Sequence, residues 1–262
     1  AETDYDVTFK GGFEIPGELL RIDIDPDQTV RNYPPHLALV ADAQIAADAL
    51  LTEVNHTPLA PRHTDWGTQR VARLWAELNP TWDAATRAQT LFLNTVLEEL
   101  PGAVLVGDST QPVYSGNLTL NLDHPRRWFN SSTGYGTLGY GLPAAIGAKL
   151  AEPGRPVISL MGDGGLQFTL PELASAVEAG VGIIVLLWNN AGYGEIKRYM
   201  ERRDITPIGV DIYTPDLLAI ARGFGCAAER ARDHDHLSEL LRGAPSDRPL
   251  IIEVLEQAPF HP

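Results

Sequence analysis

The sequence predicts an α/β fold: a doubly wound, mostly parallel sheet with helices on both faces. From about residue 100 onward, apolar runs of strand length alternate with helical patterns, which is typical of parallel sheets covered by helices. Apolar residues make up 44% of the 262 residues, enough to bury a substantial core. The length fits one large domain, or one and a half to two smaller ones.

The first part of the chain has too few elements to form a domain. Residues 19–25 and 37–40 are predicted to be strands, and an alanine-rich helix is expected from Asp42 to residue 51, with Asp42 as its cap. Two strands and one helix cannot close a sheet. Residues 1–54 are therefore expected to be the C-terminal part of a domain.

Residues 55–84 are predicted to connect this part to the main domain, residues 85–262. The connection begins with prolines and scattered polar residues, which are typical of a linker. Two helices are then expected, at about residues 64–78 and 84–100.

The main domain shows the regular alternation. Its strands are expected at residues 103–107, 157–161, 183–188 and 250–255, and its helices at 142–150, 170–179, 215–223 and 234–241. Cys226 is expected to begin a further buried strand. In sheets of this kind, ligands bind at the carboxyl ends of the strands, near the point where the strand order reverses.

The composition excludes several classes of partner. The formal charge is −14, so the surface repels nucleic acid and anionic membranes. No stretch of eighteen apolar residues is present to cross a membrane, and the acidic N-terminus lacks the pattern of a secretion signal. The single cysteine rules out an internal disulfide, and we expect a reducing, cytoplasmic compartment.

The clearest chemistry lies where two neighbouring strands are predicted to end. The first is followed by Gly162, Asp163, Gly164 and Gly165, and the second by an asparagine pair that ends with Asn190. Glycines let the main chain turn sharply beside a ligand, and the helix that follows offers its N-terminus to phosphate. Carboxylate and amide oxygens suit Mg²⁺. Both strand ends share one edge of a parallel sheet, so Asp163 and Asn190 are expected to meet at one ion.

A competing interpretation concerns Gly134, Gly136 and Gly139, which match the G-x-G-x-x-G pattern of dinucleotide-binding folds. Asp163 then lies near the position expected of the ribose-binding acid. However, residues 128–133 make a poor buried strand, and this interpretation leaves the flanking glycines and the asparagine pair unexplained. We therefore favour the phosphate and metal site.

These motifs resemble those of a known family. The Gly-Asp-Gly turn, followed after twenty-four residues by the asparagine pair, is similar to the thiamine diphosphate (ThDP) motif. Residues 134–145 resemble the stretch before that motif in the acetolactate synthase and 2-oxoacid decarboxylase superfamily. The resemblance implies that residues 85–262 are the diphosphate-binding (PP) domain. It also implies that residues 1–54 are the end of a central α/β domain.

The resemblance implies roles for individual residues. Asp163, Asn190 and the carbonyl oxygen of Gly192 are expected to bind Mg²⁺. Gly136 is expected to accept a hydrogen bond from the cofactor through its carbonyl group. Leu138 is expected to be the apolar wedge that holds ThDP bent, although the residue type by itself also fits an ordinary core position. The other cofactor contacts are expected from Ser109, Thr110, Gln111, Gly162, Gly164, Gly165, Tyr193 and Gly194.

The segment after the asparagine pair is expected to form a helix whose first turn faces the substrate. Ile196 and Tyr199 lie one turn apart, so they either line a pocket or pack the helix. The Glu195 carboxylate suits a cationic tail such as a guanidinium, or is a charge on the helix surface. Residues 188–197 and 209–216 are similar to 5-guanidino-2-oxopentanoate decarboxylases, so a guanidino 2-oxo acid is the expected substrate.

The resemblance also implies a partner. Enzymes of this kind activate ThDP with a glutamate from a pyrimidine-binding (PYR) domain, and no segment here fits that domain. We therefore expect a split or cleaved enzyme, in which a second chain carries the PYR domain and the activating glutamate, and the complete enzyme is a dimer or tetramer. On this chain, Gly136, Leu138 and Glu195 are expected to act in catalysis. The alternatives are a carboligase of the acetolactate synthase type and a non-catalytic subunit of the same fold.

Overall fold

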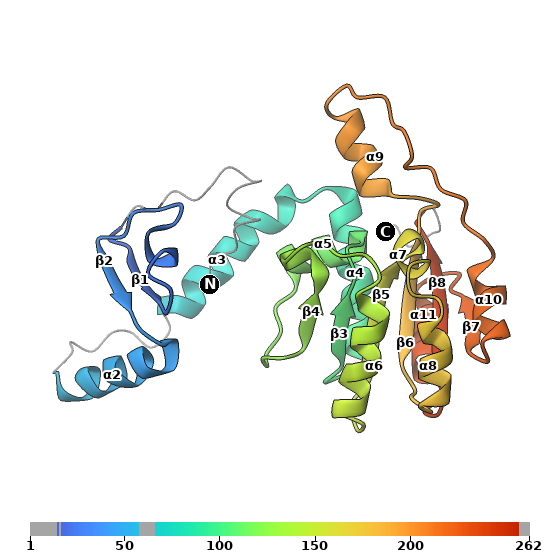
Figure 1. Cartoon of the computed structure of the whole chain (residues 1–262), viewed down its shortest axis with the longest axis horizontal. Coiled ribbons are helices and arrows are strands. Elements are labelled where there is room, and N and C mark those ends of the chain that lie inside the picture. Colours follow the sequence, from blue (N-terminus) through green and yellow to red (C-terminus); the bar gives the residue numbers. More distant parts are fainter. Residues whose placement is uncertain (1–14, 16, 58–65, 257–262) are drawn as a thin grey trace. The chain divides into compact units, whose positions relative to one another are not determined.

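The structure of the chain is a computed structural model that describes residues 15, 17–57 and 66–256. Figure 1 shows how its helices and strands follow one another. The chain divides into two compact units, residues 1–81 and 82–262, and each is described by itself.

The larger unit, residues 82–262, is built on one parallel sheet. Its six strands lie in the order β4-β3-β5-β6-β8-β7, and every neighbouring pair is parallel. The strands are Val104–Gly107 (β3), Trp128–Asn130 (β4), Val157–Gly162 (β5), Ile184–Asn189 (β6), Ala227–Arg230 (β7) and Leu250–Leu255 (β8).

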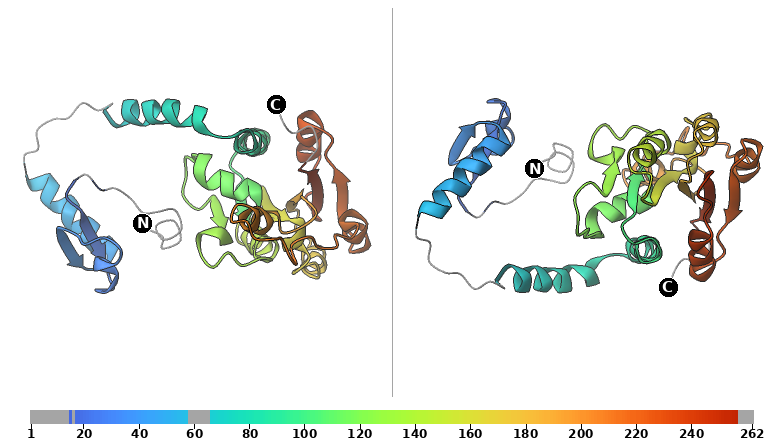
Figure 2. Two further views of the ribbon diagram at one scale, coloured as in Figure 1. Left: turned by 90° about the horizontal axis from the view of Figure 1, so that it is seen from above. Right: turned by 90° about the horizontal axis from the view of Figure 1, so that it is seen from below.

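Helices cover both faces of this sheet, which confirms the predicted fold class. They are Ala84–Glu99 (α4), Gln111–Thr119 (α5), Gly141–Ala151 (α6), Glu172–Glu178 (α8), Leu217–Gly223 (α10) and His234–Arg242 (α11). Successive strand residues point to opposite faces, so Val104 and Val106 join one buried cluster and Leu105 joins the other. The first cluster includes side chains of α6, α8 and α10, and the second those of α4, α5 and α11. Figure 2 shows α4 (teal) and α8 (gold) on opposite sides of the strands.

Aspartates begin several of these helices, as the residue type predicts. The side chain of Asp83 accepts the N–H of Thr86 at the start of α4 at 2.7 Å. Asp216 and Asp233 do the same at the starts of α10 and α11, at 2.9 Å and 2.8 Å. Each carboxylate satisfies a main-chain donor that has no partner within the helix.

The strand order reverses between β3 and β5. From β3 the chain goes to β4 on one side, and then crosses to β5 on the other side. The intervening helices α5 and α6 contribute to opposite core clusters. Such a reversal opens a crevice at the carboxyl ends of the two strands, where ligands bind in sheets of this type.

The two edge strands are less buried than the central strands. Residues 128–133, judged a poor buried strand, include β4, and its side chains are only partly buried. Cys226 is buried, but β7 begins one residue later and is half-exposed, so the prediction of a buried strand there is wrong. An edge strand has a neighbour on one side only and does not need a continuous apolar run. The helix α5 was not anticipated.

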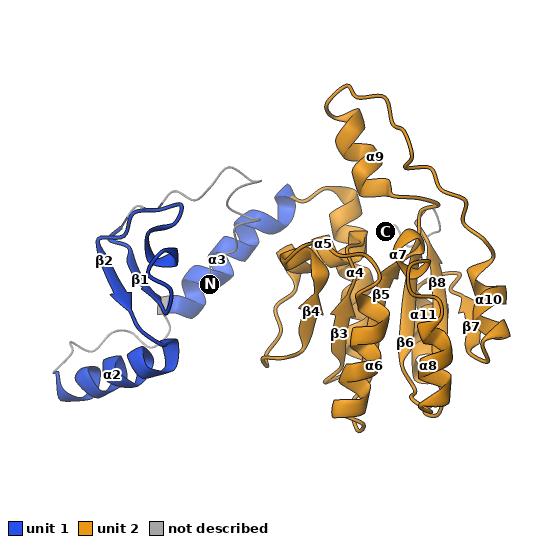
Figure 3. Ribbon diagram, in the orientation of Figure 1, with its two compact units in different colours: residues 1–81 blue, residues 82–262 orange. Residues whose placement is uncertain are grey.

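The smaller unit, residues 1–81, contains a two-stranded parallel sheet (Figure 3). Its elements are Leu20–Asp23 (β1), Gln28–Val30 (η1), Leu37–Val40 (β2), Ala43–His56 (α2), Trp66–Leu78 (α3) and Asn79–Thr81 (η2). The two strands and the helix capped by Asp42 are those expected from the sequence. The assignment of residues 1–54 to a larger domain stays a prediction. In the described part of the chain, no helix combines the length and apolar character needed to cross a bilayer.

Candidate functional site

Asp163 and Asn190 come together at the carboxyl edge of the large sheet. The register of β5 and β6 pairs Gly162 with Trp188, so the residues that follow the two strands are adjacent. Oδ1 of Asp163 accepts a hydrogen bond from the main-chain N–H of Asn190 at 3.3 Å. Asp163 opens the short helix α7 (Asp163–Leu166) and is only 1% exposed.

Three oxygen atoms converge at this point, which we call the oxygen corner: Asp163 Oδ1, Asn190 Oδ1 and the carbonyl oxygen of Gly192. The Asn190 oxygen lies 2.8 Å from the Gly192 oxygen and 3.2 Å from the Asp163 oxygen. In this orientation all three atoms are hydrogen-bond acceptors, whereas after a half-turn of the amide the Asn190 nitrogen donates to the other two; without a cation the half-turned amide satisfies the corner, and with a cation the oxygen orientation does. Neighbouring ligands of octahedral Mg²⁺, each about 2.1 Å from the ion, lie about 3 Å apart. The oxygen corner therefore fits a small divalent cation.

The oxygen corner differs from sites built on charged or imidazole ligands. Among the described residues, no group of three or more His, Cys, Asp or Glu side chains could hold a metal ion. The corner has one carboxylate, one amide and one main-chain carbonyl. Hard oxygen atoms of this kind suit Mg²⁺, which keeps several waters and needs few protein ligands.

Burial raises the pKa of the Asp163 carboxyl above its usual value, because the charged form is desolvated. The Thr214 hydroxyl donates to Oδ2 at 2.9 Å, and this bond, with main-chain bonds from Asn190 and Gly192, offsets part of the rise. A cation at the oxygen corner would favour the ionised form further. Sequence reasoning missed Thr214, which lies 51 residues from Asp163 in the chain.

Neighbouring side chains fill the space left by the glycines of the β5 turn. A Cβ atom on Gly164 would lie 2.7 Å from the ring of Tyr193, and one on Gly162 would lie 3.2 Å from the hydroxyl oxygen of Thr110. Thr110 is buried and makes no side-chain capping bond to α5. Tyr193 was expected to contact the cofactor, and its main-chain N–H donates to the carbonyl of Val210 at 2.9 Å. Tyr193 therefore meets the turn with its ring.

The loop that carries Gly136 and Leu138 lies against the same turn. Gly136 has a positive φ of 66°, and its N–H donates to the carbonyl of Ser131 at 2.9 Å. The hydroxyls of Ser131 and Ser109 hydrogen-bond at 3.1 Å. Leu138 is half-buried and belongs to neither core cluster, and its Cδ2 would lie 3.8 Å from a Cβ atom on Gly165. Its position suits a wedge better than a core residue.

Asp108 is a buried acid that sequence reasoning missed. It directly follows β3 and is 0% exposed. Burial raises the pKa of its carboxyl, and hydrogen bonds from Gly139, Ser109 and Ser131 offset part of the rise. The signal in the sequence that could have identified it is an acid immediately after a buried apolar strand.

The helix α9 (Gly194–Glu201) stands beyond the carboxyl edge of the sheet (Figure 1). The Glu195 carboxylate accepts a hydrogen bond from the side-chain amide of Gln111 at 2.9 Å. It also pairs with the guanidinium groups of Arg202 at 3.3 Å and Arg198 at 3.7 Å. Gln111, expected to contact phosphate, therefore links α9 to the end of β3.

The side chains of Ile196 and Tyr199 in α9 are on the surface. Ile196 is 52% exposed and Tyr199 is 43% exposed, and no residue of the helix is buried. Of the two interpretations of this pair, helix packing is the less consistent with the structure. The guanidinium of Arg203 lies 4.5 Å from the centre of the Tyr199 ring.

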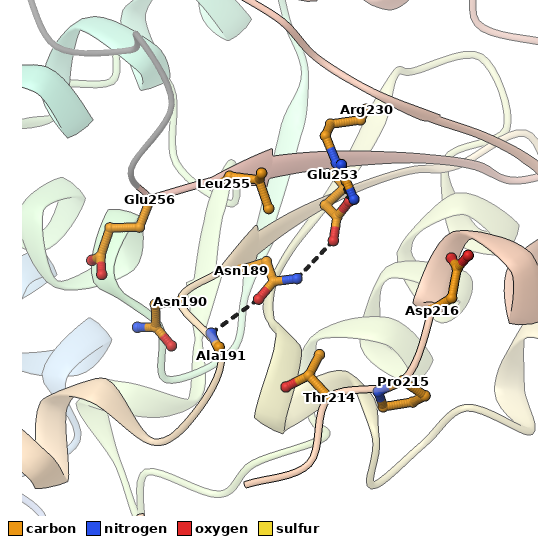
Figure 4. Close-up of a pocket in the computed structure, with 10 residues that line it drawn as sticks. All are labelled: Asn189, Asn190, Ala191, Thr214, Pro215, Asp216, Arg230, Glu253, Leu255 and Glu256. Carbon is orange, nitrogen blue, oxygen red and sulfur yellow. Dashed lines mark hydrogen bonds and ion pairs between the residues drawn. The ribbon is translucent and has the colours of Figure 1, made fainter. Parts of the chain in front are cut away.

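A pocket of about 530 Å³ opens beside the oxygen corner (Figure 4). Its wall includes the ion pair between Glu253 and Arg230 at 2.7 Å, and Asn189 donates to Glu253 at 2.7 Å. The lining residues are Asn189, Asn190, Ala191, Thr214, Pro215, Asp216, Arg230, Glu253, Leu255 and Glu256. The cavity shares Asn190 and Thr214 with the site but includes none of the expected substrate contacts of α9. It lies on the β8 side of the corner.

Comparisons with known proteins agree with this geometry. The model of one family, "Thiamine pyrophosphate enzyme, C-terminal TPP binding domain", matches residues 108–254; thiamine pyrophosphate is another name for ThDP. The chain is 40% identical over 244 residues to the probable 2-ketoarginine decarboxylase AruI of Pseudomonas aeruginosa, covering 92% of this chain and 42% of that protein. It is 33% identical to benzoylformate decarboxylase of the same species, over 92% of this chain and 44% of that protein.

The chain is also similar to an acetolactate synthase and to a solved decarboxylase structure. Acetolactate synthase large subunit IlvB1 of Mycobacterium tuberculosis is 29% identical, over 93% of this chain and 41% of that protein. A solved structure, the ThDP-dependent 4-hydroxybenzoylformate decarboxylase of Rhodococcus jostii RHA1, matches with a TM-score of 0.68 at 23% identity, over 94% of this chain and 46% of that one. This likeness shows the shared fold. The chain spans less than half the length of these relatives.

The family match leaves no room for the dinucleotide interpretation of the glycines at 134–139. The matched segment covers more than half of the chain, and it contains both strand ends of the oxygen corner. The chain belongs to the thiamine pyrophosphate enzymes, through their C-terminal TPP-binding domain.

Proposed function

We propose that this chain binds ThDP through Mg²⁺ and takes part in the decarboxylation of a 2-oxo acid. The observation that carries the proposal is the oxygen corner, where Asn190 Oδ1 faces two further acceptor oxygens at 2.8 Å and 3.2 Å. An ion there turns the repulsion among these oxygens into attraction. It also offsets the repulsion between a diphosphate and a protein of formal charge −14.

Different residues around the oxygen corner would hold the ion, the diphosphate and the rings of the cofactor. Asp163, Asn190 and the Gly192 carbonyl would hold the ion. The glycine turn after β5, with the Thr110 hydroxyl beside it, would take the diphosphate. Leu138 would support the ring portion from the neighbouring loop and keep water away. When bound, ThDP supplies the electron sink for loss of CO₂, and the chain supplies orientation and a dry surface.

Calorimetry tests the cofactor proposal directly. ThDP is titrated into the full chain with Mg²⁺, and again after the divalent ions are removed with a chelator. We expect binding with Mg²⁺ and at least about a tenfold loss without it, because the diphosphate then meets the buried Asp163 carboxylate uncompensated. Equal binding in the two titrations would contradict the proposed role of the oxygen corner.

We further propose that the substrate is a 2-oxo acid with a guanidino side chain. The 40% identity to a probable 2-ketoarginine decarboxylase supports this assignment. The Glu195 carboxylate also supports it, since it already pairs with the guanidinium groups of Arg202 and Arg198. A substrate guanidinium would take the place of one of these arginines and of the Gln111 amide as the partner of the Glu195 carboxylate.

The variant Glu195→Gln tests the substrate class, with Glu201→Gln on the same helix as the matched control. In the complete enzyme, kcat/KM is measured for a guanidino 2-oxo acid and for a neutral 2-oxo acid of the same length. We expect Glu195→Gln to lower the first value about 10- to 100-fold, which is the worth of a charged hydrogen bond, and to leave the second nearly unchanged. A parallel change for both substrates would count against the guanidinium contact.

The pyrimidine-binding half of the active site would come from outside these residues. We propose that a PYR domain outside residues 1–262 carries the activating glutamate, in a complete enzyme that is a dimer or tetramer. The shares of the relatives that the chain spans, 42% and 44%, leave length for such a domain. We expect the chain with ThDP and Mg²⁺ to decarboxylate only when that domain is supplied; enzyme-like rates without it would refute the proposal.

A carboligase of the acetolactate synthase type is the second candidate. The 29% identity to acetolactate synthase over 93% of the chain favours it to that extent. Product analysis separates the two: a decarboxylase releases CO₂ and an aldehyde, whereas a carboligase joins two 2-oxo acids with loss of one CO₂. A non-catalytic subunit would fail to bind ThDP with Mg²⁺ even in the presence of the PYR domain.

A further inference from the structure

Asp108 is placed where the strand order of the sheet reverses. Its main-chain N–H donates to the carbonyl of Leu160 in β5 at 2.8 Å, so its backbone continues the pairing of β3 with β5. Its side chain is fully buried. A buried carboxylate is costly unless several donors satisfy it, and the donors around Asp108 show what it holds together.

Both oxygens of the carboxylate accept hydrogen bonds. Oδ2 accepts the N–H of Gly139 at 2.7 Å. Oδ1 accepts the N–H of Ser109 at 2.9 Å and the hydroxyl of Ser131 at 3.3 Å. Gly139 and Ser131 flank the loop that carries Leu138, so the carboxylate ties both ends of that loop to the end of β3.

The bond to Gly139 sets the orientation of the peptide group that carries Leu138. Gly139 has a φ of +87°, and the chain contains no cis peptide among its described residues. In a trans peptide the C=O points away from the N–H. With the Gly139 N–H directed at Asp108, the Leu138 carbonyl is directed away from it, so the bond fixes the main chain directly after Leu138.

On its other side, the carboxylate abuts the β5 turn. A Cβ atom on Gly165 would collide with Oδ2 of Asp108, so only glycine leaves room for the carboxylate there. Asp108 thus lies between the loop with Gly136 and Leu138 and the turn with Gly164 and Gly165. It contacts both without belonging to either.

We propose that Asp108 is a positioning residue that sets the Leu138 loop at a fixed place relative to the diphosphate turn. The proposal rests on the ThDP assignment made above. The turn would hold the diphosphate end of ThDP and the loop would hold the ring end. Because Asp108 sets the position of the loop relative to the turn, it determines whether ThDP can contact both at the same time. A ligand that has only the diphosphate end does not depend on Asp108.

The test compares two ligands on the full chain with Mg²⁺. Calorimetry measures the affinity for ThDP and for inorganic pyrophosphate, which lacks the rings. The main variant is Asp108→Asn, which keeps the shape but presents an NH₂ group to at least one main-chain N–H. Ser131→Ala removes the 3.3 Å bond to the carboxylate, together with the 3.1 Å hydroxyl bond to Ser109, and keeps the carboxylate itself. Asp247→Asn, an exposed acid in the loop before β8, is the matched control, and thermal unfolding checks that each variant is folded.

We expect Asp108→Asn to weaken ThDP binding about tenfold, the worth of one lost bond to a charged group, while pyrophosphate affinity stays within about twofold. Ser131→Ala should shift the ratio of the two affinities in the same direction by a smaller factor, and Asp247→Asn should leave it unchanged. If Asp108→Asn does not fold, the ratio for Ser131→Ala decides the matter.

Three results would overturn the proposal, and they are distinguishable. Unchanged ThDP affinity in Asp108→Asn would show that the carboxylate does not position the ring end. If Asp108→Asn does not fold, unchanged ThDP affinity in Ser131→Ala would show the same. Equal weakening of ThDP and pyrophosphate would assign Asp108 to support of the turn or of the fold. Absence of Mg²⁺-dependent ThDP binding in the unsubstituted chain would refute the proposed function itself, and the role of Asp108 with it.

Discussion

Replacing Asp163 with asparagine separates the stability of the chain from its ability to bind a metal. The amide has the shape of the carboxylate, so packing at this nearly fully buried position is kept. Placed where Oδ1 now lies, an amide nitrogen would be 3.2 Å from the Asn190 oxygen and could donate to it. The Thr214 hydroxyl, at 2.9 Å from Oδ2, could still donate to the remaining oxygen. The variant exchanges an ion ligand for a hydrogen bond.

Two effects follow from this exchange. Without ligand, the variant loses a buried charge and gains a hydrogen bond to the Asn190 side chain, but an NH₂ group at that place no longer accepts the main-chain N–H of Asn190, which Oδ1 accepts at 3.3 Å. Each of these bonds is worth about 1 kcal/mol, so the stability of the unliganded variant should stay within about 1 kcal/mol of that of the unsubstituted chain. With Mg²⁺ and ThDP at one hundred times the dissociation constant, the unsubstituted chain gains about 2.7 kcal/mol; a hundredfold loss of affinity would reduce this gain to about 0.4 kcal/mol. For a unit of this size, these gains correspond to melting shifts of about 5–10 °C and about 1–2 °C.

Thermal unfolding with and without Mg²⁺ and ThDP measures both effects. Asp247→Asn removes the same charge at an exposed position and should keep the full ligand-dependent shift. If Asp163→Asn kept that shift as well, Asp163 would not be an ion ligand, and the oxygen corner would be a hydrogen-bonded turn. If the unliganded variant were markedly less stable, the reasoning about the buried charge would be wrong.

Three further outcomes are expected. Gly164→Ala would place a Cβ atom 2.7 Å from the Tyr193 ring and should cost about 1–3 kcal/mol of unfolding free energy, with weaker Mg²⁺-dependent ThDP binding; unchanged denaturation and titration curves would contradict the tight contact. Burial raises the pKa of Asp108 above 3.8, so the folded chain keeps that proton to higher pH than the unfolded chain. As pH rises from the pKa of Asp108 in the unfolded chain to its pKa in the folded chain, the unsubstituted chain should lose stability relative to Asp108→Asn. A difference in unfolding free energy between the two proteins that does not change with pH would refute this. Burial also raises the pKa of Cys226 to about 11, so a thiol reagent near neutral pH should label it only as the chain unfolds; rapid labelling of the folded chain would contradict its burial.

The parts predicted well from sequence are those governed by local patterns. Continuous apolar runs identified β3, β5, β6 and β8 within a residue or two, because strands covered on both faces must be apolar throughout. The edge strands β4 and β7 lack this requirement, so no strand was predicted at β4, and β7 was wrongly predicted to be buried. The helix α5 follows a strand end rich in polar residues, and its core contacts rather than its own sequence identify it.

The same division holds within the site. Asp163 and Asn190 were identified because glycines and strand ends mark them in the sequence. Thr214 was missed because its hydrogen bond to Asp163 spans 51 residues and a threonine in a loop carries no signal of its own. Tyr193 was expected to contact the cofactor, yet its main-chain N–H donates to the carbonyl of Val210, which lies in a later loop. Contacts between loops depend on how the chain returns to the sheet edge, and no local pattern records that.

By itself the sequence determined the parallel α/β fold and the two turns that belong together, since strand periodicity and glycine placement are local properties of the chain. Only the tertiary structure decided that the Asn190, Gly192 and Asp163 oxygens converge, at 2.8 Å and 3.2 Å. It also decided that Asp108 lies between the Leu138 loop and the β5 turn. The physical reason is that the burial of a side chain, and its distances to groups on other segments, are set only when distant segments meet at the end of the sheet. A residue's type says what it can bind, and only the fold says what is within reach.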